Sequence, residues 1–532
     1  MSTPSVSALD QNMIQRVCVG DIVTRSADLF PDRAAFILDD RRLTYRDLQD
    51  QSNRLGHALL GLGLRQGDVV GVLARNIPEL MVVYFACAKA GLVCAPGNLA
   101  LRAEEIGYCF KDSRARVLIV EDALTELYRA LPELPDLEHV FWTPDARGEP
   151  SEKSKGTLGE LIATGEEREL EVMIEDRDPV QLLYTSGTTA LPKGVVTSHL
   201  AVTLAALTNA LANEFKAGTT VLGNLPLFHT TAINCITVSA LTVGGTIVLI
   251  NGFEPKLVGR LIEEHRINMF VLLPIMYSQM LAEPEVRQRD LSSVKRALYA
   301  MAPMPHDRLK DIHALFPNAD VVLGSGQTEF TPATCIQRPE HQWDKAASWG
   351  PATALTRIAI MDDQGYLLPH GEEGEIVYRG PQVMNGYLNQ PEKTQESLRH
   401  GWFHSGDVAW MDEEGVVWFT DRKKDVIKTG GENVASIEVE RCLMEHPDVL
   451  EAAVVGLPHD RWGEAVTGIV VLKPGVQQDE QALLDHCRKH LAGFKVPKAV
   501  HFQAELPRTG TGKIQKHVMR DELAAFYAGR RD

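Results

Sequence analysis

The sequence predicts an α/β protein with a large N-terminal domain of helix-covered sheets, a small barrel-like subdomain and a small α+β C-terminal domain. Three observations predict this class. The chain has 532 residues, and single cores stop growing near roughly 250–300 residues, so at least two domains are expected. Before about Gly350, short apolar strands alternate with helices, which is typical of a largely parallel sheet. After Gly350, glycine-rich turns join short strands, which favours an antiparallel sheet or small barrel.

The N-terminal elements follow from the spacing of apolar residues and from their flanking glycines and prolines. Residues 43–64 have helical periodicity and end in glycines, and residues 68–74 form an apolar run typical of a buried strand. Residues 77–91 predict a helix with Pro78 near its start and Gly91 after its end. The same alternation continues through further strands at residues 115–120, 268–274 and 319–326.

The C-terminal elements differ in pattern. Residues 357–362, 374–380 and 415–421 predict the strands of the small barrel, and the polar stretch after them predicts a boundary or hinge at Lys424. We therefore divide the chain into domains 1–423 and 424–532. Within the second domain, residues 436–447 predict a helix with Ser436 as N-cap. Two strands and another helix follow, at residues 451–458, 465–472 and 479–491.

Composition excludes several classes of protein. With 44% apolar and 23% charged residues the chain is typical of soluble globular proteins, and its net charge of −17 argues against a nucleic-acid partner. Eight cysteines without a CxxC pair predict reduced, buried thiols in the cytoplasm. The N-terminus has no apolar run, so no signal peptide is expected. The uncharged stretch 229–253 contains Gly244 and Gly245, which favours a buried helix and a strand over a membrane span.

The net charge is unevenly distributed along the chain. From Arg422 to the C-terminus there are 17 basic and 16 acidic residues, so the rest of the chain carries the negative charge. The C-terminal domain is therefore the better place for an anionic partner, although ordinary surface variation explains the difference equally well.

The stretch "YTSGTTALPKGV", from Tyr184 to Val195, is typical of a phosphate-binding loop. Gly187 lets successive N–H groups face one anion, several hydroxyls can donate, and Lys193 adds a positive charge. It is not a Walker A loop, because Pro192 stands where that pattern needs glycine before its lysine.

Further motifs follow in a fixed order along most of the chain. They are "PLFH" ending at His229, "GQTE" ending at Glu329, "GEIVYRGPQVMNGY" from Gly374, "GWFHSGD" ending at Asp407, "DRKKDVIKTGGENV", and "LPRTGTGKIQK" with Lys513. Together with the loop, they closely resemble the signature of the adenylate-forming (ANL) superfamily: acyl-CoA and aryl-CoA ligases, adenylation domains and luciferase-like proteins.

The resemblance implies an enzyme that uses ATP, Mg²⁺ and coenzyme A and rotates its mobile C-terminal domain between two half-reactions. Lys513 is expected to bridge the substrate carboxylate and the α-phosphate, and Glu329 to bind Mg²⁺. His229 is expected at the junction of the acyl pocket and the thiol tunnel, and Lys424 at the hinge. The resemblance assigns the remaining residues to nucleotide or coenzyme binding: Thr185, Ser186, Gly187, Thr188, Thr189, Ala190 and Lys193 for the β and γ phosphates; Ala300, Ser325, Gly326, Gln327 and Thr328 near the adenine and α-phosphate; Asp407 and Arg422 at the ribose; Gly430 and Gly431 at the pantetheine tunnel.

Three positions depart from the family pattern at the ATP end. Ala190 and Ala300 replace glycines, and Ser325 stands where an aromatic ring usually stacks on adenine. A left-handed backbone at Ala190 costs ~1–2 kcal/mol, and a lost stacking face ~1–3 kcal/mol. Because only attack of the acid on ATP expels pyrophosphate, Ala190 is expected to impair adenylation more than thioester formation.

The resulting prediction is an acid–CoA ligase acting through an acyl-AMP. Alternatives left open are a ligase that only converts preformed acyl-AMP, a stand-alone enzyme that loads a carrier protein, and a non-catalytic acyl or nucleotide sensor. The small and apolar residues after His229 favour a bulky apolar acid: aryl, alicyclic or medium-chain fatty. The expected partners are thus a carboxylic acid and coenzyme A, bound by a monomer or homodimer with no membrane span.

Overall fold

The computed structural model describes residues 6–144, 156–185, 191–300, 304, 306–508 and 514–528. The chain forms two compact units. The first comprises Met1–Ile358, Tyr378–Phe403 and Glu414–Val417, and the second comprises Ala359–Val377, His404–Glu413 and Trp418–Asp532. The domain division at Lys424 stays a prediction.

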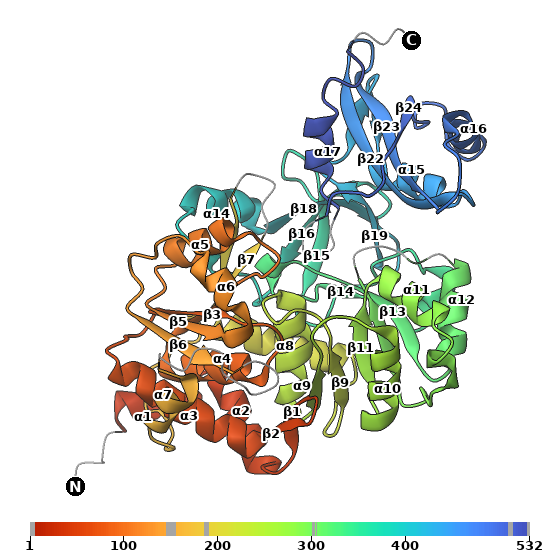
Figure 1. The fold of residues 1–532 in the computed structure, drawn as a ribbon. Helices are drawn as coiled ribbons and strands as arrows, with labels where there is room; N and C mark the ends of the chain where they lie inside the picture. The colour runs from red at the N-terminus through yellow and green to blue at the C-terminus, as the bar shows by residue number, and fades with distance from the viewer. Residues whose placement is uncertain are drawn as a thin grey trace. The chain divides into compact units, whose positions relative to one another are not determined.

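The first unit contains a seven-stranded sheet with helices on its faces (Figure 1). Its strands β4, β3, β5 and β6 pair in parallel, whereas β7 and β8 form an antiparallel hairpin and β17 pairs antiparallel to β8. In spatial order the strands are β17 (Gly386–Tyr387), β8 (Lys193–Ser198), β7 (Pro179–Thr185), β4 (Val93–Pro96), β3 (Val69–Leu73), β5 (Val117–Glu121) and β6 (His139–Thr143).

An eight-stranded sheet lies in the same unit. Its central strands pair in parallel, and antiparallel partners close both edges. The predicted, largely parallel architecture is therefore confirmed. In spatial order the strands are β14 (Cys335–Ile336), β13 (Asp320–Ser325), β12 (Arg296–Tyr299), β11 (Met269–Leu272), β9 (Thr220–Gly223), β10 (Thr246–Leu249), β1 (Ala34–Leu38) and β2 (Arg41–Thr44).

The helices of the first unit cover these sheets, and α4 is the most deeply buried of the longer ones. Every residue of α4 except Glu79 is buried, as expected for a helix that is apolar all round. Gly91 ends it in the left-handed conformation, at φ 69°. The longer helices are α2 (Gly20–Leu29), α3 (Tyr45–Gly61), α4 (Pro78–Ala90), α5 (Ala103–Asp112), α8 (His199–Ala212), α10 (Pro255–His265), α11 (Pro274–Ala282) and α12 (His306–Leu315).

The shorter helices complete this unit. The predicted buried helix after His229 is a π-helix over Thr231–Val238 that continues into α9 (Ser239–Thr242) and is followed by strand β10. Among the described residues, no helix has the length and hydropathy that crossing a membrane requires. The other short helices are α1 (Ala8–Gln15), α6 (Thr125–Arg129), α7 (Leu158–Ala163), α13 (His341–Asp344) and α14 (Pro391–Ser397).

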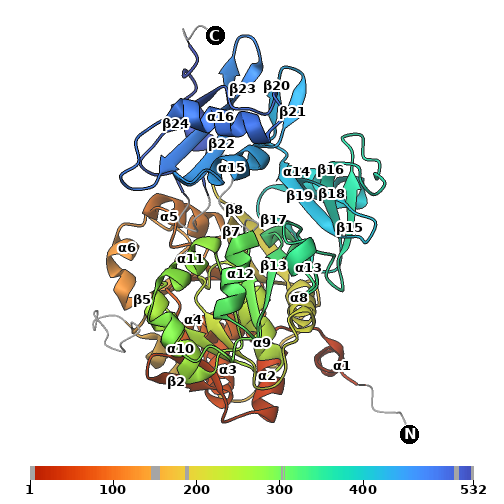
Figure 2. The same cartoon turned by 90° about the vertical axis from the view of Figure 1, so that its right-hand side faces the viewer.

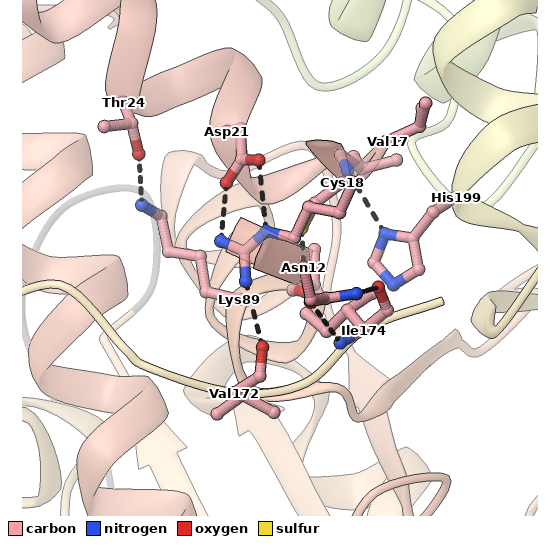
Figure 3. A network of polar contacts seen from close by, with 12 residues as sticks. Asn12, Val17, Cys18, Asp21, Thr24, Lys89, Val172, Ile174 and His199 are labelled. Atoms are coloured by element: carbon pink, nitrogen blue, oxygen red, sulfur yellow. Dashed lines mark hydrogen bonds and ion pairs between the residues drawn. The ribbon is translucent and has the colours of Figure 1, made fainter. Parts of the chain in front are cut away.

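A buried polar network ties the N-terminal helices to the body of the first unit (Figure 3). Arg16 pairs with Asp21 at 2.9 Å, and Lys89 Nζ donates to Thr24 at 2.7 Å. His199, at the start of α8, accepts the N–H of Val19 through Nδ1 at 3.1 Å. These bonds satisfy charged groups that the surrounding apolar core would otherwise leave unpaired.

The second unit holds most of a four-stranded sheet and the whole of a five-stranded one (Figure 2). The four-stranded sheet is the predicted small barrel region, with order β15 (Arg357–Met361), β16 (Gly374–Arg379), β18 (Phe403–Met411) and β19 (Val417–Arg422). The five-stranded sheet comprises β21 (Glu432–Val434), β20 (Ile427–Thr429), β23 (Gly463–Leu472), β22 (Val449–His459) and β24 (Ala499–Phe502), with helices α15 (Ser436–Met444), α16 (Glu480–His490) and α17 (Lys516–Glu522).

The predicted N-cap of α15 was wrong. Ala435 occupies the N-cap position in an extended conformation, and Ser436 is the first residue inside the helix. The hydroxyl and N–H of Ser436 both donate to the buried carboxylate of Asp421, so the side chain serves a tertiary contact instead of a cap.

The prediction that the cysteines are buried and unpaired is confirmed for all eight.

Candidate functional site

In the first unit, the two ends of the predicted phosphate loop meet as neighbouring strands. Thr185 ends β7 and pairs directly with Lys193, which begins β8. Desolvation, followed by the charge of Lys393, lowers the pKa of Lys193. The loop residues between these ends, Ser186, Gly187, Thr188, Thr189 and Ala190, lie outside the described part of the chain.

Glu329 lies beside this strand pair although 136 residues separate it from Lys193 in the sequence. It belongs to a single 3₁₀ turn, Thr328–Phe330, that follows strand β13. Tyr387 of β17 donates its hydroxyl to Glu329 Oε1 at 2.9 Å, and the ammonium of Lys193 lies 5.3 Å from the centre of the Tyr387 ring. A carboxylate, an ammonium and a phenol thus gather at the base of the predicted phosphate loop.

The predicted adenine-side residues occupy strand ends in the same unit. Ala300 follows β12, and Ser325 ends β13 and pairs with Cys335. Gly326 leaves no room for a side chain, because an added Cβ would lie 2.4 Å from Pro332. Gln327 and Thr328 are both half-buried. These positions share the carboxyl-terminal edge of parallel strands, where open α/β sheets bind ligands.

His229 stands in the turn before the π-helix. Its Nδ1 accepts the N–H of Thr231 at 3.2 Å, so the neutral ring carries its proton on Nε2. The π-helix that follows buries Ala232, Ile233 and Cys235 among its residues. π-Helical turns frequently occur at functional sites.

In the second unit, Asp407 and Arg422 form an ion pair. Asp407 is only 2% exposed, and its Oδ1 lies 2.7 Å from Arg422 Nε. The part of strand β18 that carries Asp407 is held by Glu375, which accepts the N–H of Gly406 at 3.0 Å and lies 3.1 Å from Nδ1 of His404. Burial opposes ionisation of Glu375, but the bond to His404 and the charge of Lys423 outweigh it and lower the pKa of this carboxyl.

The predicted hinge is flanked by polar contacts within the second unit. Lys423 pairs with Asp363 at 2.7 Å, and Asp425 pairs with Arg520 of α17 at 2.6 Å. Lys424 stands between these two pairs and is exposed. Lys513 lies outside the described residues, although its loop ends in a bridge between Arg508 and Ile514.

Gly430 and Gly431 form a two-residue hairpin turn between β20 and β21. Both have positive φ, at 59° and 91°, as the tight turns of β-hairpins require. Gly430 donates its N–H to the carbonyl of Trp462 at 2.8 Å, and the Trp462 indole lies against the same glycine.

Two cations gather around Trp462, an arrangement not expected from the sequence. The ammonium of Lys498 lies 4.5 Å from the indole ring, and the guanidinium of Arg461 lies 4.7 Å from it. Lys498 is distant from Trp462 in the sequence, and only Arg461, next to the tryptophan in "DRWGEA", signals the arrangement.

The protein ligands available at this site fit a Mg²⁺ ion that binds together with a nucleotide. Glu329 offers a hard oxygen ligand, and magnesium is usually bound through one or two carboxylates together with substrate phosphates. Within the described residues, no cluster of three or more His, Cys, Asp or Glu side chains could hold a metal ion by itself.

Comparison with known proteins gives consistent matches over almost the whole chain. Residues 23–388 match the family described as AMP-binding enzyme, and residues 438–513 match the AMP-binding enzyme C-terminal domain. A feruloyl-CoA synthase of Amycolatopsis sp is 36% identical, covering 94% of this chain and 98% of that protein. An indoleacetate–CoA ligase of Aromatoleum aromaticum is 33% identical, covering 94% and 97%. The solved anthranilate CoA ligase AuaEII, in complex with anthranoyl-AMP, superposes with a TM-score of 0.87 at 27% identity, covering 97% of this chain and 99% of that one.

Proposed function

Because the chain belongs to the family of AMP-binding enzymes and is an acid–CoA ligase that uses ATP, Mg²⁺ and coenzyme A, we propose how its residues divide the two steps and which acid they accept. The observation that carries the proposal is the cluster of Lys193, Tyr387 and Glu329 at the ends of the phosphate loop.

In the first step, a carboxylate oxygen of the acid attacks the α-phosphorus of ATP and the bond to pyrophosphate breaks. Lys193 and the loop from Thr185 grip the β and γ phosphates, and Thr328 contacts the α-phosphate. Lys513 would bring a positive charge to the two reacting anions and so stabilise the charge that builds at the transition state. Glu329 would hold Mg²⁺ on the protein side, and the metal would supply positive charge that neutralises the phosphates.

The nucleoside is held in both steps by Asp407, Arg422 and the strand ends at Ala300 and Ser325. A buried carboxylate has lone pairs for two ribose hydroxyls. The guanidinium of Arg422 pairs with the buried carboxylate of Asp407 and so compensates its charge. Glu375 supports this arrangement through the Gly406 N–H that precedes Asp407.

In the second step, the thiol of coenzyme A attacks the acyl carbon and AMP leaves. The hairpin turn at Gly430 and Gly431 forms one wall of the pantetheine tunnel, and His229 stands where tunnel and acyl pocket meet. We infer that Trp462, Lys498 and Arg461 bind the nucleotide end of coenzyme A, because cations suit its phosphates and an indole face suits adenine. Rotation about Lys424 exchanges the two arrangements.

We further propose that the acid is aromatic. The π-helix after His229 presents small and apolar residues, and the relatives named above act on feruloyl, indoleacetate and anthranilate groups.

We also propose a cytoplasmic location, which the eight unpaired cysteines support.

The test supplies a panel of aromatic and fatty acids with ATP, Mg²⁺ and coenzyme A, and measures thioester by mass spectrometry together with AMP. An aromatic acyl-CoA is the expected product. Release of AMP without any thioester, followed by acyl transfer to an added carrier protein, would instead establish a carrier-protein loader. A fatty acid preferred over every aromatic acid would refute the proposed substrate class.

A second arm supplies synthetic acyl-AMP with coenzyme A. If Lys513 serves only the first step, Lys513→Ala loses acid-dependent pyrophosphate release while keeping thioester formation from acyl-AMP. Loss of both reactions by this variant would contradict the division of roles. A wild-type enzyme that uses only acyl-AMP would identify the ligase specialised in the second step.

A further inference from the structure

Tyr387 links two residues of the proposed ATP site. Its hydroxyl donates to Glu329 Oε1 at 2.9 Å, and its ring lies under the ammonium of Lys193 at 5.3 Å. The two charged groups do not pair with each other in the structure, although both are described and their charges interact. The same phenol therefore interacts with both an anion and a cation that would otherwise attract each other.

The main chain fixes both ends of this arrangement. Tyr387 pairs with Val195 two residues after Lys193, and its N–H donates to Thr394 at 2.9 Å. The carbonyl of Glu329 accepts the N–H of Met384 at 2.8 Å, from the same segment that leads into β17. The hydroxyl and the carboxylate are thus brought together by backbone pairing on both sides.

The hydrogen bond gives Glu329 a fixed donor. The phenol hydroxyl donates its proton to Oε1 of the carboxylate. A neutral donor occupies one carboxylate oxygen and leaves the negative charge in place. Because the hydrogen bond to Oε1 limits rotation of the carboxylate, the second oxygen, Oε2, is held in a restricted orientation.

We propose that Tyr387 is a positioning residue that orients Glu329 towards Mg²⁺ and keeps Lys193 from pairing with it, so that both charges act on the metal–ATP complex. This inference rests on the proposed role of Glu329 in the first step. It predicts that loss of one hydroxyl weakens metal binding and adenylation selectively.

The experiment compares Tyr387→Phe with wild type, using Mn²⁺ as the probe metal. Free Mn²⁺ is counted by electron paramagnetic resonance in the presence of ATP and without acid, so the readout does not depend on turnover. Phenylalanine keeps the ring under Lys193, so ATP binding without metal should not change. The Kd for Mn²⁺ should rise about tenfold, as expected for a hydrogen bond to a charged group.

Half-reaction rates provide the second readout. Pyrophosphate release by Tyr387→Phe should fall about tenfold at subsaturating Mg²⁺, whereas thioester formation from synthetic acyl-AMP should be unchanged. Tyr84→Phe is the matched control, because it removes a buried tyrosine hydroxyl that donates to neutral Gln181 at 3.0 Å. It should lower the melting temperature without changing the Kd for Mn²⁺.

An unchanged Kd for Mn²⁺ in Tyr387→Phe would overturn the inference, as would an equal loss in both half-reactions. Glu329→Gln separates the inference from its premise. If this variant binds Mn²⁺ like wild type, the proposed role of Glu329 fails and the inference fails with it. If the wild type makes no thioester from any acid, the proposed function fails, yet the Mn²⁺ comparison still decides the role of Tyr387.

Discussion

At the scale of single residues, a methyl group at position 190 is the departure with the clearest consequence. Glycine in a phosphate loop serves a left-handed backbone or a close approach to the ligand, and alanine restricts both. Under the proposed roles, the step that expels pyrophosphate depends on this loop, whereas attack of a thiol on acyl-AMP does not.

Ala190→Gly should therefore speed pyrophosphate release from acid and ATP by about tenfold, corresponding to the ~1–2 kcal/mol that alanine costs where a phosphate loop needs a left-handed backbone. Thioester formation from acyl-AMP is the internal control and should keep its rate. Both rates are measured by stopped-flow on the same preparation. If both rise together, or neither changes, the steric argument at position 190 is wrong.

At the scale of elements, the hairpin between β20 and β21 depends on its two glycines. Alanine at Gly430 would take a left-handed conformation at a cost of ~1–2 kcal/mol, and its Cβ would lie 3.0 Å from Trp462 Cε3. Gly430→Ala should raise KM for coenzyme A several-fold and leave pyrophosphate release unchanged. Gly415→Ala is the control, because φ there is 74° but nothing lies within 4 Å of the added Cβ. Equal effects of the two variants on KM would contradict a contact-based role.

The attachment of the N-terminal helices depends on His199, whose Nδ1 accepts the N–H of Val19 while the ring is neutral. Burial lowers the pKa of His199 to about 3, against about 6.5 in the unfolded chain. Below pH 6.5 the unfolded state takes up a proton that the folded state does not, so stability is full above this pH and falls as the solution is acidified. Between pH 6.5 and 5 the loss should be roughly 2 kcal/mol. In His199→Asn the side-chain oxygen can still accept the Val19 N–H, so the free energy of unfolding, measured in urea, should fall less steeply as the pH is lowered than in the wild type. An equally steep fall in the variant would exclude His199 as the cause.

Elements with strong local signals could be predicted from the sequence. Helix α4 has Pro78 at its start and Gly91 beyond its end, and the structure confirms both. Ser436 misled the analysis because its hydroxyl serves Asp421, fifteen residues away, instead of its own helix. The contacts of Tyr387 with Glu329 and of Lys498 with Trp462 could not be predicted, because each depends on strand pairings that bring distant segments together.

At the scale of the whole molecule, the proposed cycle requires the backbone at Lys424 to take two conformations. Ion pairs flank it on both sides: Lys423 pairs with Asp363 and Glu375, and Asp425 pairs with Arg520. Lys424 itself is exposed. The bending should therefore concentrate at this single residue, as expected for hinges that absorb large changes of φ and ψ.

Proline at position 424 would fix φ near −65° and so favour one of the two conformations. Lys424→Pro should slow one half-reaction at least tenfold more than the other, since a single backbone state can serve only one pose. Lys424→Ala removes the same side chain without fixing the backbone, and it should affect the two half-reactions within a few-fold of each other. Both rates and the melting temperature are measured for each variant. If proline slows both half-reactions equally, or slows neither, the proposed rotation of the C-terminal domain does not depend on the backbone at Lys424.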